Sequence, residues 1–374
     1  MLSHMNIFFS LALSFTIVYF VIPKIIKVSK IIKLYDVPNQ RSAAKQIVPT
    51  LGGIAIFASF IISTIVSSNS LSINELKSMF VGVTIMFLIG LKDDIIGLSA
   101  KKKLVFQIAT ALYLVILGNY RITNLHGILG FQEIGYVIGV LISMVAIVGI
   151  INAFNLIDGV DGLASGIGIL VSAILGVLFL SAGDYIYAIA CFSLTGSLLA
   201  FYIYNVFGHT NKIFMGDTGS LILGIVVAAL IIHFVEFTPV SSSAMQGSVA
   251  IALSLIIVPV IDTIRVFAIR ISQKRSPFSP DMNHIHHNIL KLTGNHLATS
   301  SIIIGVNALI VWFAFLFIEE IGNPLLFVIL LVTGFILAGI PAILVKRLPK
   351  IVRIQKLEKK SIFALSIMTK KPKE

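Results

Sequence analysis

Residues 136–162 read YVIGVLISMVAIVGIINAFNLIDGVDG, and this stretch decides the fold class. Its first part is an uncharged apolar run, and a hydrocarbon core about 30 Å thick needs roughly 20 such residues for one helical crossing. Asn152, Asn155, Asp158 and Asp161 then follow at every third position. The pattern predicts a membrane-spanning helix that ends in a polar, glycine-containing segment.

Apolar runs of this kind recur along the chain. Of its 374 residues, 57% are hydrophobic and 12% are charged, and the mean hydropathy is +1.02, a balance that excludes a soluble globular protein. We predict an all-α, polytopic integral membrane protein with about eleven transmembrane helices. The expected spans are 5–23, 51–68, 78–91, 104–118, 136–154, 163–181, 186–206, 218–235, 247–269, 299–318 and 325–345.

Lysine and arginine predict the orientation of these spans. If the connecting segments alternate between two sides, one side receives 24–50, 92–103, 155–162, 207–217, 270–298 and the segment from Lys346. All but two of the 28 Lys and Arg residues, Lys77 and Arg121, lie in this set or at its membrane boundary. By the positive-inside rule this side is cytoplasmic, so the N-terminus is expected outside and the C-terminus in the cytoplasm. We expect one transmembrane catalytic domain over 1–345, with those loops forming the active site, and a basic cytoplasmic tail over 346–374.

Composition also narrows the partners. In a soluble protein the net charge of +12 would suggest binding of nucleic acid. Beside a bilayer the same charge indicates contact with anionic lipid, so no nucleic-acid partner is expected. Cys191 is the single cysteine, which excludes a disulfide framework and a cysteine-rich metal site.

The acidic residues differ in type between the two sides. Outside the tail, every acidic residue on the expected cytoplasmic side is aspartate: Asp36, Asp93, Asp94, Asp158, Asp161, Asp217, Asp262 and Asp281. Mg2+ prefers oxygen ligands and is commonly held by one or two carboxylates together with substrate phosphates. The pattern indicates phosphate chemistry with Mg2+ as the cofactor, for which Mn2+ could substitute.

Three acidic motifs concentrate this signal. Asp93 and Asp94 are adjacent, and adjacent carboxylates repel unless they share a cation or a proton, although a solvated helix end explains such a pair equally well. The segment Asn152–Gly162 carries two asparagines and two aspartates at one spacing, which a glycine-capped helix end does not explain. Asp217 opens an apolar run, where a helix N-terminus can bind an anion, although simple capping by Asp217 or Thr218 would give the same pattern.

Histidines and basic residues lie in the same loops. His284, His286 and His287 form a His-Ile-His-His sequence, and the absence of a nearby cysteine favours phosphate contact over zinc. Lys101, Lys102 and Lys103 form a run that can hold a diphosphate or can simply follow the positive-inside rule.

Asp262 and Arg265 form a weaker candidate. They are three residues apart on one predicted helix, so they can pair with each other or contact substrate at the membrane boundary.

Taken together, these motifs resemble those of the polyprenyl-phosphate N-acetylhexosamine-1-phosphate transferases, in particular the WecA-like branch of glycosyltransferase family 4. The matching segments follow one another through all the main cytoplasmic loops: Asp36–Asn39 with Pro49–Gly53, Asp93–Asp94 with Leu98–Lys101, Asn152–Gly162, Met215–Ser220 and Ser276–His287. Their order makes the resemblance specific, although each motif alone would be weak.

The resemblance implies a reaction. A lipid phosphate, expected to be undecaprenyl phosphate, would attack the β-phosphorus of a UDP-N-acetylhexosamine and release UMP. The His-Ile-His-His form is similar to that of the GlcNAc branch, so GlcNAc is the expected sugar. A one-step displacement and a two-step route through an aspartyl-phosphate both fit these residues.

The resemblance also implies residue roles. Asp93 or Asp94 would be the base or would organise the lipid phosphate, and Asp217 with Asp94 would bind Mg2+. Substrate and catalytic roles would fall to a wider set: Asn152, Asn155, Asp158 and Asp161 at the nucleotide diphosphate, Lys101 and Lys103 at phosphates, His284, His286 and His287 at phosphate or sugar, and Asp262 and Arg265 as weaker contacts.

The chain departs from the family pattern at two places. Gly97 stands where the often-quoted DDxxD pattern has its third acidic residue, so this position cannot supply a ligand. Ser42 and Ala44 stand where the family commonly has a lysine and a histidine, which puts lipid or diphosphate contacts of that loop in doubt.

Two other classes remain to be distinguished. A lipid-linked sugar transporter is the default for so many spans, but transporters usually place ionisable groups near the midplane. A CDP-alcohol phosphotransferase shares the Asp-Gly pairs but would need a downstream acidic pair that is missing. For the transferase we expect a multi-pass protein of the bacterial inner membrane with a cytoplasmic active site, and the oligomeric state is open between monomer and homodimer.

Overall fold

The computed structural model describes residues 2–32, 35–36, 48–68, 72–236, 248–276 and 282–347. Within these ranges the chain forms thirteen α-helices, two short 3-10 helices and one pair of two-residue strands. The helices are α1 (Leu2–Ile31), α2 (Gly52–Ser67), α3 (Lys77–Ile96), α4 (Ala100–Ile116), α5 (Tyr136–Ile157), α6 (Leu163–Ser181), α7 (Tyr185–Val206), α8 (Gly216–Glu236), α9 (Val249–Leu255), α10 (Ile257–Ser272), α11 (Ile285–Thr293), α12 (His296–Ile321) and α13 (Asn323–Arg347). The 3-10 helices are η1 (Ser72–Leu76) and η2 (Ile128–Gly130), and the strands are β1 (Tyr35–Asp36) and β2 (Val48–Pro49).

The predicted all-α membrane fold is confirmed in its class. Seven of the described helices are long and apolar enough to cross a membrane, or eight if α9 and α10 count as one span. The predicted number of about eleven is not confirmed, because α2 and α4 have only 16 and 17 residues. The third apolar run, α3, ends in the charged residues Lys92, Asp93 and Asp94, which shorten its apolar part.

The predicted single span 247–269 is wrong in one respect. It is broken at Ile256 into α9 and α10, whose axes differ by 79°. The helix α11 lies inside the loop predicted at 270–298, so part of that loop is itself helical. The strands β1 and β2 pair antiparallel, and residues 37–47 between them lie outside the described ranges.

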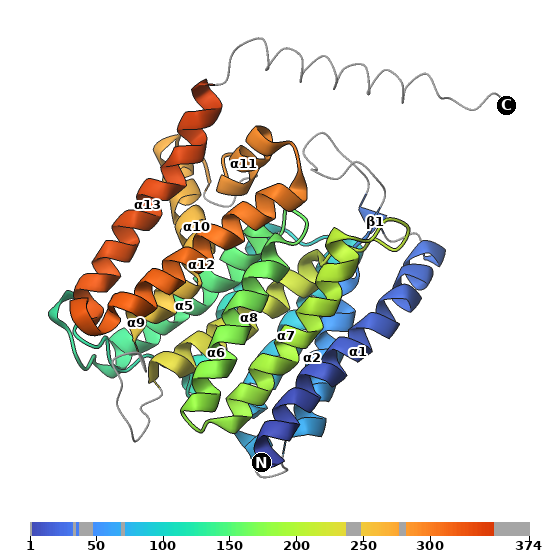
Figure 1. The fold of residues 1–374 in the computed structure, drawn as a ribbon, viewed down its shortest axis with the longest axis horizontal. Helices are drawn as coiled ribbons and strands as arrows, with labels where there is room; N and C mark the ends of the chain where they lie inside the picture. Colours follow the sequence, from blue (N-terminus) through green and yellow to red (C-terminus); the bar gives the residue numbers. More distant parts are fainter. Residues whose placement is uncertain are drawn as a thin grey trace.

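The helices pack as a bundle in which α8 is the most enclosed. α8 contacts α2, α3 and α5, and its residues from Thr218 to Ile232 are buried. α1 begins at one end of the bundle, whereas α13 ends at the opposite end, where α11 and β1 also lie (Figure 1). We call this second end the site end, because α3 ends, α4 begins, α5 ends and α8 begins there.

Two glycines allow backbone-to-backbone contact at the site end. A Cβ added to Gly53 in α2 would lie 2.2 Å from the backbone nitrogen of Gly219, and one added to Gly90 in α3 would lie 2.5 Å from the Cα of Thr218. Small residues let helix backbones approach closely in membranes, where packing is the main source of helix association. The start of α8 is therefore fixed against α2 and α3.

Candidate active site

Asp94 binds the first turn of α8. Its Oδ1 accepts a hydrogen bond from the backbone nitrogen of Asp217 at 2.8 Å, and its Oδ2 accepts from the backbone nitrogen and the hydroxyl of Thr218 at 3.0 and 2.6 Å. These amides have no partner within their own helix, so Asp94 acts as a cap supplied by another helix. Burial raises the pKa of Asp94 to about 6 even though the three hydrogen bonds favour its ionised form.

Lys103 lies between two carboxylates from different helices. Its Nζ pairs with Asp93 and lies 2.7 Å from Oδ1 of Asp217. Burial lowers the pKa of this lysine, but the two carboxylates outweigh it, so the pKa of Lys103 is raised and the ammonium is kept. The sequence begins α4 at Ala100, after the cap residue Ser99, and thereby places Lys103 one turn into the helix and over the start of α8.

Asn155 joins α5 to the same carboxylate. Its amide donates to Oδ1 of Asp217 at 2.6 Å and to the hydroxyl of Ser220 at 2.8 Å. Asn152, one turn earlier, does not reach this group, because its amide donates to Gln107 of α4 and to the carbonyl of Val148. The two asparagines expected at one substrate site thus have different surroundings.

Asp158 follows α5 as its C-terminal cap residue and is half-buried. Burial raises its pKa well above the usual value, and the carboxylates of Asp217, Asp161 and Asp94 raise it further. Three negative neighbours act on this group, so the site end holds more negative than positive charge close to Asp158. A cation or a proton is needed to offset such an excess.

Asp161 forms a separate ion-pair cluster. Its Oδ2 lies 2.5 Å from Nζ of Lys212 and 3.2 Å from Nδ1 of His296. Burial would raise the pKa of Asp161, but these two partners outweigh it and lower the pKa.

Lys101, expected at the substrate phosphates together with Lys103, lies elsewhere. It is exposed, as is Lys102, whereas Lys103 is half-buried between Asp93 and Asp217. Adjacent positions on a helix are about 100° apart around its axis, so three consecutive lysines cannot all face one site.

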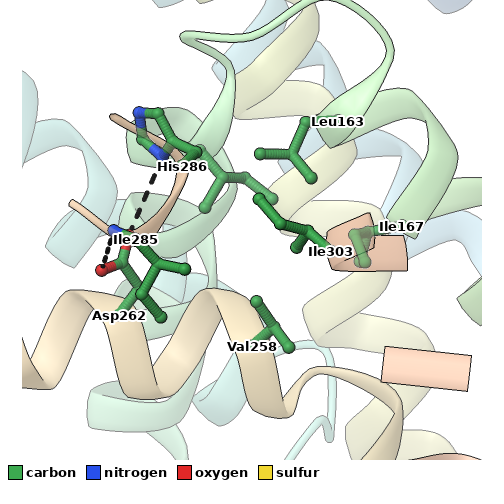
Figure 2. Close-up of a pocket in the computed structure, with 8 residues that line it drawn as sticks. Leu163, Ile167, Val258, Asp262, Ile285, His286 and Ile303 are labelled. Carbon is green, nitrogen blue, oxygen red and sulfur yellow. Dashed lines mark hydrogen bonds and ion pairs between the residues drawn. The ribbon is translucent and has the colours of Figure 1, made fainter. Parts of the chain in front are cut away.

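A second polar cluster lies around Asp262, which is 1% exposed. Its Oδ1 accepts from the backbone nitrogen of Ile285 at 2.9 Å and from Arg265 at 3.2 Å, and its Oδ2 accepts from Nδ1 of His284 at 3.0 Å. Arg265 also donates to the carbonyl of Asn283. Asp262 and Arg265 therefore pair with each other, as one alternative predicted, and together they fix the start of α11. Figure 2 shows the bond of Asp262 to Ile285 at this point.

His284 has a defined proton position. Nε2 lies 3.3 Å from the guanidinium of the buried Arg270, and because a guanidinium only donates, Nε2 must accept. The proton is then on Nδ1 and points to Asp262. Asp262, His284 and His286 offer three metal-ligand atoms within 4.8 Å of one another. A metal on Nδ1 of His284 would force an N–H against Arg270, so the geometry disfavours a metal on that atom. Contact of His284 with phosphate stays a prediction.

His286 and His287 lie between Asp262 and the polar segment after α5. His286 is 2% exposed, and burial, with His287 close by, lowers its pKa to about 3, so it is neutral. It lines a small cavity with Asp262 and the aliphatic side chains of α6, α10 and α12 (Figure 2). A Cβ on Gly159 would lie 3.1 Å from Nε2 of His286 and 3.9 Å from the His287 ring. The glycine after Asp158 thus lets α11 lie directly against the polar segment.

Some residues of these clusters were not singled out from the sequence. Lys212 and His296 pair with Asp161, Asn205 binds the backbone of Gly162, and Arg270 contacts His284. No local signal distinguished Arg270 from the basic residues around it, because its burial depends on the tertiary fold. Several quoted motif residues lie outside the described ranges: Val37–Asn39, Ser42, Ala44, Pro277–Asp281 and the tail from 348.

The fold and the site define a class: a polytopic helical membrane protein with aspartates, lysine and asparagine from four helices gathered at one end of its bundle. The pattern of the family described as glycosyl transferase family 4 matches residues 76–235, which contain α3 to α8.

Relatives along most of the chain agree with this match. A Bacillus subtilis (strain 168) protein named probable undecaprenyl-phosphate N-acetylglucosaminyl 1-phosphate transferase is 32% identical over 262 residues, covering 70% of this chain and 71% of the relative. Undecaprenyl-phosphate alpha-N-acetylglucosaminyl 1-phosphate transferases of Escherichia coli O157:H7 and Yersinia pestis are 30% and 27% identical over 268 residues, with 71% of this chain covered in both cases and 71% and 72% of the relatives. The chain belongs to glycosyl transferase family 4.

Proposed function

We propose that this chain transfers GlcNAc-1-phosphate from UDP-GlcNAc to undecaprenyl phosphate and releases UMP. The observation that carries the proposal is the meeting of Asp93, Asp217, Lys103 and Asn155 at the start of α8, beside Asp158. Phosphoryl transfer chiefly requires positioning and neutralisation of charge, which such a set supplies. The names of the relatives support undecaprenyl phosphate and GlcNAc as the transferred partners.

The donor set of the site fits Mg2+. It consists of carboxylate and amide oxygens, and the carboxylates around Asp158 leave negative charge in excess. We propose Asp217 and Asp158 as the residues that would hold the ion. Asp94 was expected as a ligand, but both its oxygens bind the first turn of α8, so we assign it to the positioning of Asp217. When bound, Mg2+ would neutralise charge on the donor diphosphate.

The chain's own groups then divide the remaining work. The Lys103 ammonium can bind a phosphate oxygen while offsetting the repulsion between Asp93 and Asp217. Asp93 accepts from the backbone nitrogen of Leu98 and pairs with Lys103, and burial with Asp217 raises its pKa, which suits a group that organises or deprotonates the lipid phosphate. Of the two adjacent aspartates, we therefore propose Asp93 for that role.

We further propose the topology that the basic residues predict. The chain would cross a bacterial inner membrane about eleven times, with the N-terminus outside, the C-terminus inside and the site end in the cytoplasm. Nucleotide sugars are then available at the site end, and the lipid acceptor reaches it from the bilayer.

The test is an assay of UMP release. Detergent-purified protein should release UMP from UDP-GlcNAc when undecaprenyl phosphate and Mg2+ are present, and a panel of UDP-N-acetylhexosamines and UDP-MurNAc-pentapeptide should rank UDP-GlcNAc first. No UMP from any donor would contradict the proposal, and movement of lipid-linked sugar across proteoliposomes without UMP would indicate a transporter.

A separate variant tests the assignment of Asp217 as a Mg2+ ligand. Asp217→Asn should raise the Mg2+ concentration needed for half-maximal rate, whereas Glu133→Gln, an exposed carboxylate near η2, should leave it unchanged. An unaltered Mg2+ response in Asp217→Asn would remove Asp217 as a ligand.

A further inference from the structure

The polar segment after α5 is held by residues from three other parts of the chain. Lys212, in the loop between α7 and α8, lies 2.5 Å from Oδ2 of Asp161, and His296, the first residue of α12, lies 3.2 Å from the same oxygen. Asn205 of α7 accepts from the backbone nitrogen of Gly162 at 2.6 Å and donates to the carbonyl of Ile213 at 2.9 Å. We call Asp161, Lys212 and His296 the Asp161 node.

The node restricts movement of the segment in more than one direction. The side chain of Asp161 is only 12% exposed, so removal of its partners would leave a largely buried charge unpaired. Gly162 has a φ of +78°, and a Cβ there would lie 2.6 Å from Val206 and 2.8 Å from Tyr202 of α7. The chain is thus fixed by its side chain at Asp161 and by its backbone at Gly162.

The node is linked to the site through Asp158, only three residues earlier. The Asp161 carboxylate is one of the charges that act on Asp158, and the ammonium of Lys212 offsets this charge. A change in the node therefore alters both the place and the electrostatic surroundings of Asp158. Displacements of about 1 Å at a distance from the reacting atoms can reduce a rate by about 100-fold.

We propose that Lys212 and His296 are positioning residues for the transfer reaction and that they act through Asp161, which orients Asp158 and does not itself touch the reacting groups. This inference rests on the proposed function, and it assigns roles to two residues outside the motifs of the sequence. Asp161, expected among the catalytic residues, then has a supporting role.

A double-mutant cycle of UMP release tests the proposal. Lys212→Met and Asp161→Asn should each lower kcat about tenfold to 100-fold, and the double variant should be no worse than the poorer single variant, because the second change removes an interaction already lost. Lys212→Arg should restore most of the rate, since the charge is kept. Lys102→Met, which removes an exposed lysine of the same end, is the matched control and should keep full activity.

His296 provides an independent measurement. Nδ1 of His296 accepts from the backbone nitrogen of Asp161 at 3.3 Å. His296→Gln keeps an acceptor for this bond and should retain more activity than His296→Leu, at equal thermal stability of the two purified variants. Each variant's melting temperature separates loss of folding from loss of positioning, since only variants that unfold near the temperature of the unaltered chain enter the cycle.

The outcomes separate this inference from the proposed function. If the unaltered chain releases no UMP, the proposed function fails. If it is active but Asp161→Asn loses far more than Lys212→Met, or the double variant shows the product of both losses, Asp161 contacts the reacting groups directly and the inference is overturned. Full activity of Lys212→Met overturns it as well.

Discussion

Lys103 in α4 places its Nζ 2.7 Å from Oδ1 of Asp217 in α8, so two helices that are far apart in the sequence meet through one ion pair at the site. Asn155 donates to the same oxygen. This arrangement puts one basic residue of a lysine run inside the site and leaves its neighbours outside.

The first prediction compares two of these lysines. Lys103→Met should lower kcat about 100-fold or more, because it removes the cation between Asp93 and Asp217 and a donor for phosphate oxygens. Lys101→Met, at an exposed position two residues earlier, should change kcat only slightly. Measured UMP release that falls equally in both variants would contradict the placement of Lys103.

A second prediction concerns stability and pH. The pKa of Asp94 is raised to about 6 by burial, against 3.8 without the protein environment. The folded state therefore binds this proton more tightly than the unfolded state, so Asp94 contributes stability below its unfolded value that is lost as the pH rises through 6. Asp94→Asn, which is always neutral, should show a smaller fall in melting temperature between pH 4.5 and 7 than the unaltered chain. Parallel curves for the two proteins would exclude a raised pKa at Asp94.

A third prediction tests the anchor of α11. Asp262→Asn should weaken the start of this helix, because the buried carboxylate accepts from Ile285, His284 and Arg265. Truncating one partner of a buried charged group costs about 3–5 kcal/mol, so a lower melting temperature and faster proteolysis near 276–285 are expected. Asp184→Asn at the opposite end, whose partner is His233, is a control that should leave proteolysis at 276–285 unchanged.

A fourth prediction uses glycine packing. Gly53→Ala should destabilise the fold, because the added methyl group would overlap the backbone of Gly219 and force α2 away from α8. Gly149→Ala in α5 meets open space and should be neutral or slightly stabilising, since alanine favours a helix. The difference in melting temperature between these two variants is the measurement, and equal values would contradict the close approach.

The sequence predicted the helices well because apolar length is a local property. Each expected span corresponds to a helix, and among the described residues one span is broken, at Ile256. Pro259 marks this bend in the sequence, because it has no N–H for the carbonyl of Leu255, which accepts from Asn307 instead. The number of membrane crossings was harder to predict. α2 and α4 are barely long enough to cross a membrane, and α3 carries three charged residues near its end. The acidic loops were also found, because few aspartates occur in so apolar a chain.

The roles within the site were harder to predict, since they depend on contacts between distant residues. Nothing local distinguishes Asp93 from Asp94, yet one pairs with Lys103 and the other binds Asp217 at the start of α8, 123 residues further along. His284 likewise looks equivalent to His287 in sequence, but its ring is buried between Asp262 and Arg270. Helical geometry could have indicated that one lysine of the run at most faces the site, though not which one.

The contact of Gly53 and Gly90 with the first turn of α8 bears on how this site can evolve. Where two helix backbones touch, any side chain larger than hydrogen would separate the helices. Substitutions at Gly53 and Gly90 are therefore not expected to be tolerated. Contacts made by side chains elsewhere in the bundle can change one residue at a time. Substitutions among family members are therefore expected to accumulate at such contacts, while positions 53 and 90 remain glycine.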